Sequence, residues 1–302
     1  MSAAPGVASS LPFGSVRLHS PPALVDPSSW KASLALTFSA REGSTCLVRR
    51  GHQGPLVVQR SFFPEGRKVC HVYILHPPGG IVPGDSLSLD VEIQEQAHAL
   101  VTAPAATKVY RSDGRTSRQV QTLRAAADSA VEWLPQETIL FEGARVHLET
   151  RIELSGSAAF IGWDILCLGR PACAERFGAT SSCRQHFEVW RDGQPIVLER
   201  SRYEGSMQDA AWGLRGASVT ATLLAASPAL THESKDSLLQ ELRGIRVREG
   251  ELSSASLVNG VVVLRYLGNG AEQARNLFEK AWHILRPMIV GRPACLPRIW
   301  ST

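Results

Sequence analysis

The sequence lacks a hydrophobic run long enough to cross a membrane. Its longest uncharged stretch extends from Gly216 to His232 and is interrupted by Pro228 and several hydroxyl residues. A bilayer crossing needs about 20 consecutive apolar residues, so we expect no transmembrane helix. A secretory signal has a positively charged start followed by a continuous apolar segment. The N-terminus of this sequence has no charge before Arg17 and no such apolar segment. We therefore expect a cytoplasmic protein that does not contact membranes.

Lysine is scarce, and neither sign of charge dominates. Only 5 of the 32 basic residues are Lys, and 28 acidic residues reduce the net charge to +4. Such a mixture gives no broad positive field for nucleic acid or anionic lipid. The cysteines are few, and in a reducing compartment we expect free thiols and no disulfide framework. They are Cys46, Cys70, Cys167, Cys173, Cys183 and Cys295.

Catalytic signatures are missing as well. The sequence contains neither the Gly-x-Ser-x-Gly motif of hydrolases nor the His-Glu-x-x-His motif of metalloproteases. The segment Gly79 to Ser86 has the glycine spacing of a phosphate-binding loop, but Asp85 stands where the lysine belongs. A carboxylate there would repel a phosphate group. We expect a tight loop at this point and a protein without enzymatic activity.

From Trp30 onward the hydrophobic residues mostly recur with a period of two. Leu87, Leu89, Val91 and Ile93 alternate with polar residues, and the segments 34–38 and 146–154 follow the same pattern. This alternation predicts strands with one buried face. Asp113-Gly114 and Asp192-Gly193 each predict the turn of a β-hairpin.

Two amphipathic helices interrupt the strands. The first is predicted to begin at a Ser234 cap and to end at Gly244. The second follows Gly270, carries apolar residues at helical spacing, and is predicted to end at Pro287. The Pro- and Ser-rich residues 1–29 predict a flexible tail. We therefore predict a mainly β protein of many short strands with two α-helices, formed by residues 30–302 as one domain.

Cys70, His71 and His76 are weak candidates for metal ligands. Neighbouring residues of a strand point to opposite faces, so the side chains of Cys70 and His71 diverge. Cys70 and His76 share a face but would lie about 20 Å apart at roughly 3.3 Å per residue. These three residues cannot chelate one ion locally, and a core thiol and hydrogen-bonded histidines remain the simpler interpretation.

Acidic residues beside apolar strands are more informative. The segment Phe160 to Leu168 is apolar except for Asp164, and a carboxylate in a strand buried on both faces needs a partner or a wet cavity. Glu199 and Asp85 also adjoin apolar strands. Each of the three would singly favour a salt bridge. Together, converging on a polar cavity, they would suit a divalent cation that binds weakly, because oxygen ligands hold such ions less tightly than thiolate or imidazole sets.

Several segments resemble the urease accessory protein family called UreD or UreH, in the order in which that family has them. The resemblance extends from about Trp30 to the end of the chain. The matching segments are Gly54 to Gly66, Cys70 to Asp85, Ala106 to Gly114, Glu132 to Phe141, Gly162 to Ala172, Arg191 to Arg200, Leu285 to Pro287 and Leu296 to Trp300.

This resemblance implies a helicoid stack of strands with two helices, and a chaperone of urease maturation. Its partners would be apo-urease, a UreF-like adaptor and a UreG-like GTPase, and its role would be to assist nickel insertion. The family is also credited with an internal passage for nickel, so Ni²⁺ would be a transient cargo and no cofactor would be tightly bound. Matched to the family's motifs, Asp85, Thr107, Asp164 and Glu199 are the candidate passage residues. The alternative is a pure scaffold that opens apo-urease without contacting nickel.

A basic group could form a docking face for an acidic partner. It comprises Lys108, Arg111, Arg115 and Arg118. A solvated hairpin is the simpler interpretation of the same residues.

Overall fold

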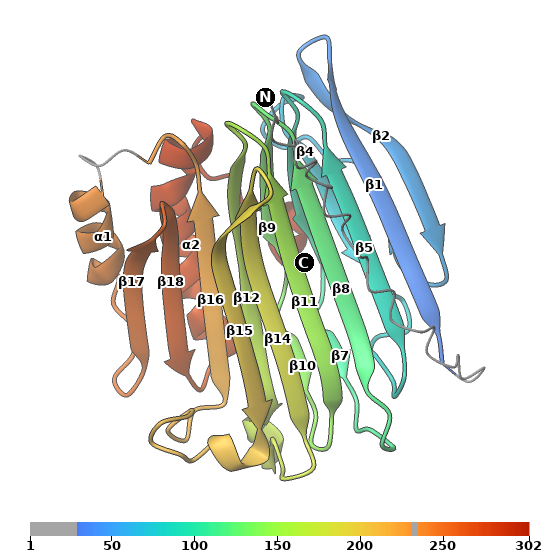
Figure 1. The fold of residues 1–302 in the computed structure, drawn as a ribbon, viewed down its shortest axis with the longest axis vertical. Coiled ribbons are helices and arrows are strands. Elements are labelled where there is room, and N and C mark those ends of the chain that lie inside the picture. Colours follow the sequence, from blue (N-terminus) through green and yellow to red (C-terminus); the bar gives the residue numbers. More distant parts are fainter. Residues whose placement is uncertain (1–28, 231–234, 302) are drawn as a thin grey trace, which may run out of the picture.

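Two β-sheets and two α-helices form three stacked layers in the computed structural model, which describes residues 29–230 and 235–301 (Figure 1). The predicted tail, residues 1–29, lies outside the described residues except for Ser29. The prediction of a mainly β protein with two α-helices is confirmed. None of the described helices is both long and apolar enough to cross a bilayer.

Within the described residues the first sheet has seven strands in the order β15-β14-β11-β8-β5-β1-β2. Its strands are β1 (Lys31–Arg41), β2 (Ser44–Gln53), β5 (Ser86–Ile93), β8 (Ser117–Ala125), β11 (Arg145–Leu154), β14 (Ser182–Arg191) and β15 (Gln194–Glu204).

The second sheet follows the order β17-β18-β16-β12-β9-β6-β4-β3, with three short strands attached beside it. The strands of this order are β3 (Val57–Val58), β4 (Cys70–Leu75), β6 (His98–Thr102), β9 (Ala130–Leu134), β12 (Ala159–Arg170), β16 (Val219–Ala226), β17 (Leu252–Val258) and β18 (Val261–Gly268). The attached strands are β7 (Thr107–Val109), β10 (Thr138–Leu140) and β13 (Glu175–Arg176).

The chain winds between the sheets instead of crossing through helices. Strands β1, β5, β8, β11 and β14 are parallel neighbours in the first sheet, and β4, β6, β9 and β12 are parallel neighbours in the second. At one end of the stack the chain passes from the first sheet to the second through the short turns 94–97, 126–129 and 155–158. At the other end the return connections are longer, and they include β7 and β10.

One predicted hairpin is confirmed and the other is wrong. At Asp192-Gly193 both residues have positive φ, and β14 pairs antiparallel with β15 as expected. Asp113-Gly114 instead lies between β7 and β8, which belong to different sheets and do not pair with each other. The long connection turns there but carries the chain across to the opposite sheet.

The helices cover the outer face of the second sheet. Helix α1 (Lys235–Gly244) packs on β17, and helix α2 (Ala271–Val290) packs on β12, β16 and β18. The first helix ends at Gly244 as predicted, and its predicted cap Ser234 lies outside the described residues. The predicted end of the second helix at Pro287 is wrong, because α2 continues to Val290 and ends at Gly291 with φ 68°. Ile289 is buried in this last turn, and its burial favours a helix that continues past the proline. Short 3₁₀ helices span Pro171–Cys173, Gly205–Met207 and Arg298–Ser301.

Two hydrophobic cores follow from this layering. Inward residues of both sheets, such as Leu89, Leu123 and Phe160, form the core between the sheets. Residues of the opposite face of β12, such as Trp163, pack against α2 residues such as Phe278 in the second core. Strand β12 is therefore buried on both faces, which explains its almost continuous apolar sequence.

Candidate functional site

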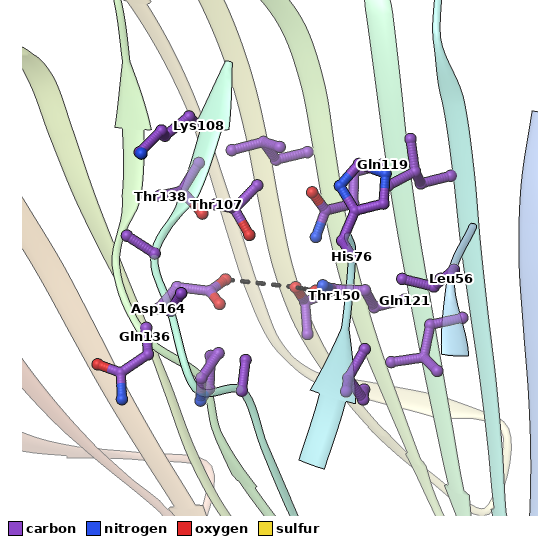
Figure 2. A pocket seen from close by; sticks show the side chains of 18 of the residues that line it. Leu56, His76, Thr107, Lys108, Gln119, Gln121, Gln136, Thr138, Thr150 and Asp164 are labelled. Atoms are coloured by element: carbon purple, nitrogen blue, oxygen red, sulfur yellow. Dashed lines mark hydrogen bonds between the residues drawn. The ribbon is translucent and has the colours of Figure 1, made fainter. Parts of the chain in front are cut away.

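A cavity of about 620 Å³ lies between the sheets, at the end where the connections are long (Figure 2). Strands β5, β8, β11 and β14 line it from the first sheet, and β4, β9 and β12 line it from the second. Residues of three of the long connections, 76–85, 103–116 and 135–144, complete the wall. Four wall residues, Pro77, Gly79, Ala105 and Lys108, are exposed on the protein surface, so the cavity reaches solvent on this side.

The cavity wall carries an unusual number of polar side chains for the interior of a β-sandwich. They include His76, Thr107, Lys108, Gln119, Gln121, Gln136, Thr138, Thr150, Asp164 and Gln185. Two polar atoms of the wall, Oε1 of Gln119 and Nε1 of Trp133, are buried without a hydrogen-bond partner in the protein. Unpaired polar atoms are costly to bury, and a polar space of this size is readily filled by water that satisfies them. We infer that the cavity is hydrated.

Asp164 reaches from β12 across the cavity to the opposite sheet (Figure 2). Its Oδ2 lies 3.3 Å from Oγ1 of Thr150 on β11, and the same hydroxyl lies 2.8 Å from Oε1 of Gln121 on β8. A threonine hydroxyl has one proton to donate, so it can donate to only one of these oxygens at a time. With Thr150 donating to Gln121, a protonated Asp164 can donate to Thr150 in turn.

The environment of Asp164 raises the pKa of its carboxyl toward neutral pH. Burial raises the pKa of this carboxyl to about 7, and the neighbouring polar groups of Thr150, Trp133 and Gln185 only partly oppose the rise. The Trp133 contribution is weak, since its Nε1 makes no hydrogen bond of normal geometry. No arginine or lysine pairs with Asp164 among the described residues. With a pKa near 7, the Asp164 carboxyl is only partly ionised at neutral pH.

Two further wall residues were expected from the sequence to have functional roles. Thr107 lies on β7, where its backbone N donates to the Glu137 carbonyl at 2.9 Å and fixes its strand against the neighbouring connection. His76 follows β4, and burial lowers the pKa of its imidazole while the charge of Asp85 partly opposes that shift. His76 is thus favoured in its neutral form, which can accept a hydrogen bond or bind a cation.

Comparison with known proteins identifies the family. The profile of the UreD urease accessory protein family matches residues 31–301. The chain belongs to the UreD family. It is 43% identical to urease accessory protein UreD of Dechloromonas aromatica over 278 residues, which covers 91% of this chain and 95% of that protein. It is 45% identical to the UreD of Alkalilimnicola ehrlichii over 278 residues, covering 90% and 92% of the two chains.

In this UreD-family chain, the other two candidate passage residues do not line the cavity. Asp85 is buried, and its carboxylate accepts from the backbone N of Trp30 at 3.1 Å and of Val82 at 3.0 Å. These bonds hold the loop that leads into β5. Glu199 on β15 forms an ion pair with Arg265 on β18, which joins the two sheets. The structure thus brings Thr107 and Asp164 to one cavity and leaves Asp85 and Glu199 in structural contacts elsewhere.

The weak metal candidates are separated in the UreD-family fold. Cys70 lies in the core between the sheets, where burial raises the pKa of its thiol. His71 is fully buried, and its Nε2 lies 2.8 Å from Oε1 of Glu65. His76 alone lines the cavity. Within the described residues these three form no common metal cluster.

The predicted basic group is largely neutralised. Arg111 pairs with Glu142 at 3.0 Å, Arg115 with Asp113 at 2.6 Å, and Arg118 with Glu149 at 3.2 Å. Lys108 lies at the cavity wall. Three of the four members therefore already face a carboxylate of the same chain, which weakens their field toward an acidic partner.

Sequence reasoning missed the amides and hydroxyls that make the cavity polar. Thr150 occupies an inward position of an alternating strand, between Leu148 and Ile152, where an apolar residue is expected. Gln119 and Gln121 likewise occupy inward positions of β8 where apolar residues are expected. Polar residues at inward positions are a sequence signal for a polar cavity. Only the parallel register of β8 and β11 shows that these residues lie next to one another across the two strands.

Proposed function

We propose that the chain is a maturation factor of urease that assists nickel insertion, both as a scaffold and as a route for the ion. Relatives covering most of the chain are named urease accessory proteins, which supports the maturation role. The expected partners are apo-urease, a UreF-like adaptor and a UreG-like GTPase. In this proposal the chain catalyses no reaction of its own.

The observation that carries the ion route is the polar cavity with Asp164 in its wall. Among the described residues that line it, the polar groups are chiefly carboxyl, hydroxyl and amide groups, with a single imidazole at His76, an indole at Trp133, an exposed amine at Lys108 and no thiol. Oxygen ligands bind Ni²⁺ less tightly than sets of thiolates and imidazoles. Such a lining favours passage of a hydrated Ni²⁺ over its retention.

Partial ionisation of Asp164 also keeps the affinity of the cavity for Ni²⁺ low. Because its pKa is raised to about 7, the carboxyl is only partly charged at neutral pH. An approaching cation favours the charged form, and release of the cation favours return of the proton. The side chain can therefore attract an ion without the full affinity of a permanent buried charge.

Blocking the cavity tests this proposal. Thr107→Trp places an indole in the cavity wall, and Thr107→Ser is the matched control that keeps the hydroxyl. Asp164→Ala removes the carboxylate without filling the space. Each variant is produced together with urease and the other accessory proteins, and urease is then purified. The measurements are the nickel content of urease and the recovery of the complex by pull-down.

We expect Thr107→Trp and Asp164→Ala to assemble with urease normally and to leave it several-fold poorer in nickel, with Thr107→Ser close to the wild type. Fully metallated urease from the first two variants would contradict the ion route and leave a pure scaffold that opens apo-urease. Loss of complex formation with Thr107→Ser would show instead that this wall is a docking element.

A further inference from the structure

A cluster of three potential metal ligands lies on the first sheet. His147 and Glu149 are two residues apart on β11, so their side chains share a face. His186 lies on β14, directly opposite Glu149 in the parallel register. Leu148 and Thr150, which alternate with the β11 ligands, point toward the cavity, so the cluster belongs to the outer face of this sheet. Of the three, only Glu149 also borders the cavity.

The distances within the cluster are close to those of a metal site. One ligand atom from each residue can be chosen so that all three lie within 4.8 Å of one another. The two imidazole rings meet edge to face, with centroids 5.0 Å apart and an interplanar angle of 82°. An ion bound at about 2.1 Å from each ligand needs ligand atoms about 3 to 4 Å apart. Side-chain rotations that close the cluster by about 1 Å would satisfy this need, with the strands unchanged.

The hydrogen bonding around the cluster is incomplete. Nε2 of His147 is buried and has no hydrogen-bond partner in the protein. A buried ring nitrogen without a partner is costly, and an ion bound at this position would remove that cost. Glu149 accepts from Nη2 of Arg118 at 3.2 Å, and the Arg118 side chain is 55% exposed. An exposed pair of this kind contributes about 1 kcal/mol or less, so metal binding can displace it.

We propose that His147, Glu149 and His186 bind a divalent transition-metal ion of the Cu²⁺, Ni²⁺ and Zn²⁺ class. Two imidazoles and one carboxylate suit these ions better than Mg²⁺ or Ca²⁺, which prefer oxygen ligands. Three protein ligands leave at least one coordination position of such an ion for water. The site shares Glu149 with the cavity wall, but it does not depend on the ion route proposed above.

Metal binding by the untagged full chain tests this site. Equilibrium dialysis against Ni²⁺, Cu²⁺ or Zn²⁺ measures stoichiometry and affinity, and electron paramagnetic resonance of the Cu²⁺ form reports nitrogen coordination. We expect His147→Ala/His186→Ala to lose one bound ion per chain and the nitrogen signature with it. We expect Glu149→Gln to weaken binding by about tenfold or more. The matched control is His52→Ala/His283→Ala, which removes two exposed histidines elsewhere and should bind metal as the wild type does.

Retention of the same stoichiometry and affinity in His147→Ala/His186→Ala would overturn the site, as would a Cu²⁺ spectrum without nitrogen coordination in the wild type. Should the double variant fail to fold, judged by circular dichroism, the single change His186→Gln decides the question in the same assay. Asp164→Asn distinguishes this site from the cavity: it alters the ion route only, so the ion bound by the two histidines should remain.

Discussion

At the residue scale, Asp164 makes the stability of the protein depend on pH. Folding raises the pKa of this carboxyl from 3.8 to about 7, so between these values the folded state keeps a proton that the unfolded state has lost. Stability therefore falls as pH rises through this window, and the full cost is present above pH 7. A shift of one pKa unit corresponds to about 1.4 kcal/mol, which places the cost at no more than about 4 kcal/mol.

Replacing Asp164 by an uncharged isostere should remove this cost. We expect Asp164→Asn to equal the wild type in stability near pH 4 and to exceed it increasingly as pH rises to 8, by at most about 4 kcal/mol. Urea denaturation of both proteins at four pH values in this range measures the difference. Glu199→Gln, which alters a carboxylate outside the cavity, serves as control. A difference between Asp164→Asn and wild type that is independent of pH would show that Asp164 ionises freely in the folded protein.

At the scale of elements, helix α2 is joined to the second sheet by a buried charge cluster. Arg286 is fully buried and donates to Glu132 on β9 at 3.0 Å and to Glu65 at 2.6 Å. Trp282 donates to the same Glu132 at 2.7 Å. Burial alone would raise the pKa of Glu132, but His98 and Arg286 outweigh it and lower that pKa to about 2. The cluster therefore stays charged, and each member depends on the others.

Removing the arginine should destabilise the whole protein. Arg286→Met leaves two carboxylates without their guanidinium partner, and breaking a buried pair in this way costs about 3 to 5 kcal/mol. The control lies on the same helix: Arg275 pairs with Glu137, both partly exposed, so Arg275→Met should cost about 1 kcal/mol or less. The free energy of unfolding in urea checks both values. Equal losses in the two variants would mean that the buried cluster contributes no more than a surface pair.

The same elements show what the sequence could and could not predict. Alternating residues located strands such as β5 and β11, and the apolar stripe located α2, because these patterns depend on local burial alone. The predicted end of α2 is wrong because the packing of Ile289 overrides the local effect of Pro287. The sequence indicates Asp164 because a carboxylate is unusual in an apolar strand, whereas His147 and His186 lie on different strands that only the register brings together. Partners across strands have no local signature.

At the scale of the whole molecule, the two ends of the strand stack differ. The cavity opens among the long connections, whereas fully buried apolar side chains such as Leu123, Ile152 and Phe160 fill the space between the sheets further along the strands. Beyond them, the short turns border a second pocket of about 540 Å³, with Glu42 and Lys68 in its wall. A hydrated ion would lose most of its solvation in that apolar layer. Any ion route through the cavity should therefore begin and end on the side of the long connections.

This asymmetry predicts that charge at the turn end does not control nickel delivery. Glu42→Ala/Lys68→Ala removes one charge of each sign from the second pocket and leaves the net charge unchanged. We expect urease matured with this variant to contain as much nickel as with the wild type, in the same preparations in which Thr107→Trp lowers it. The comparison is made per assembled complex, so that a change in docking is not mistaken for a change in transport. Nickel-poor urease in intact complexes of the turn-end variant would mean that the apolar layer opens and that the ion travels the length of the strands.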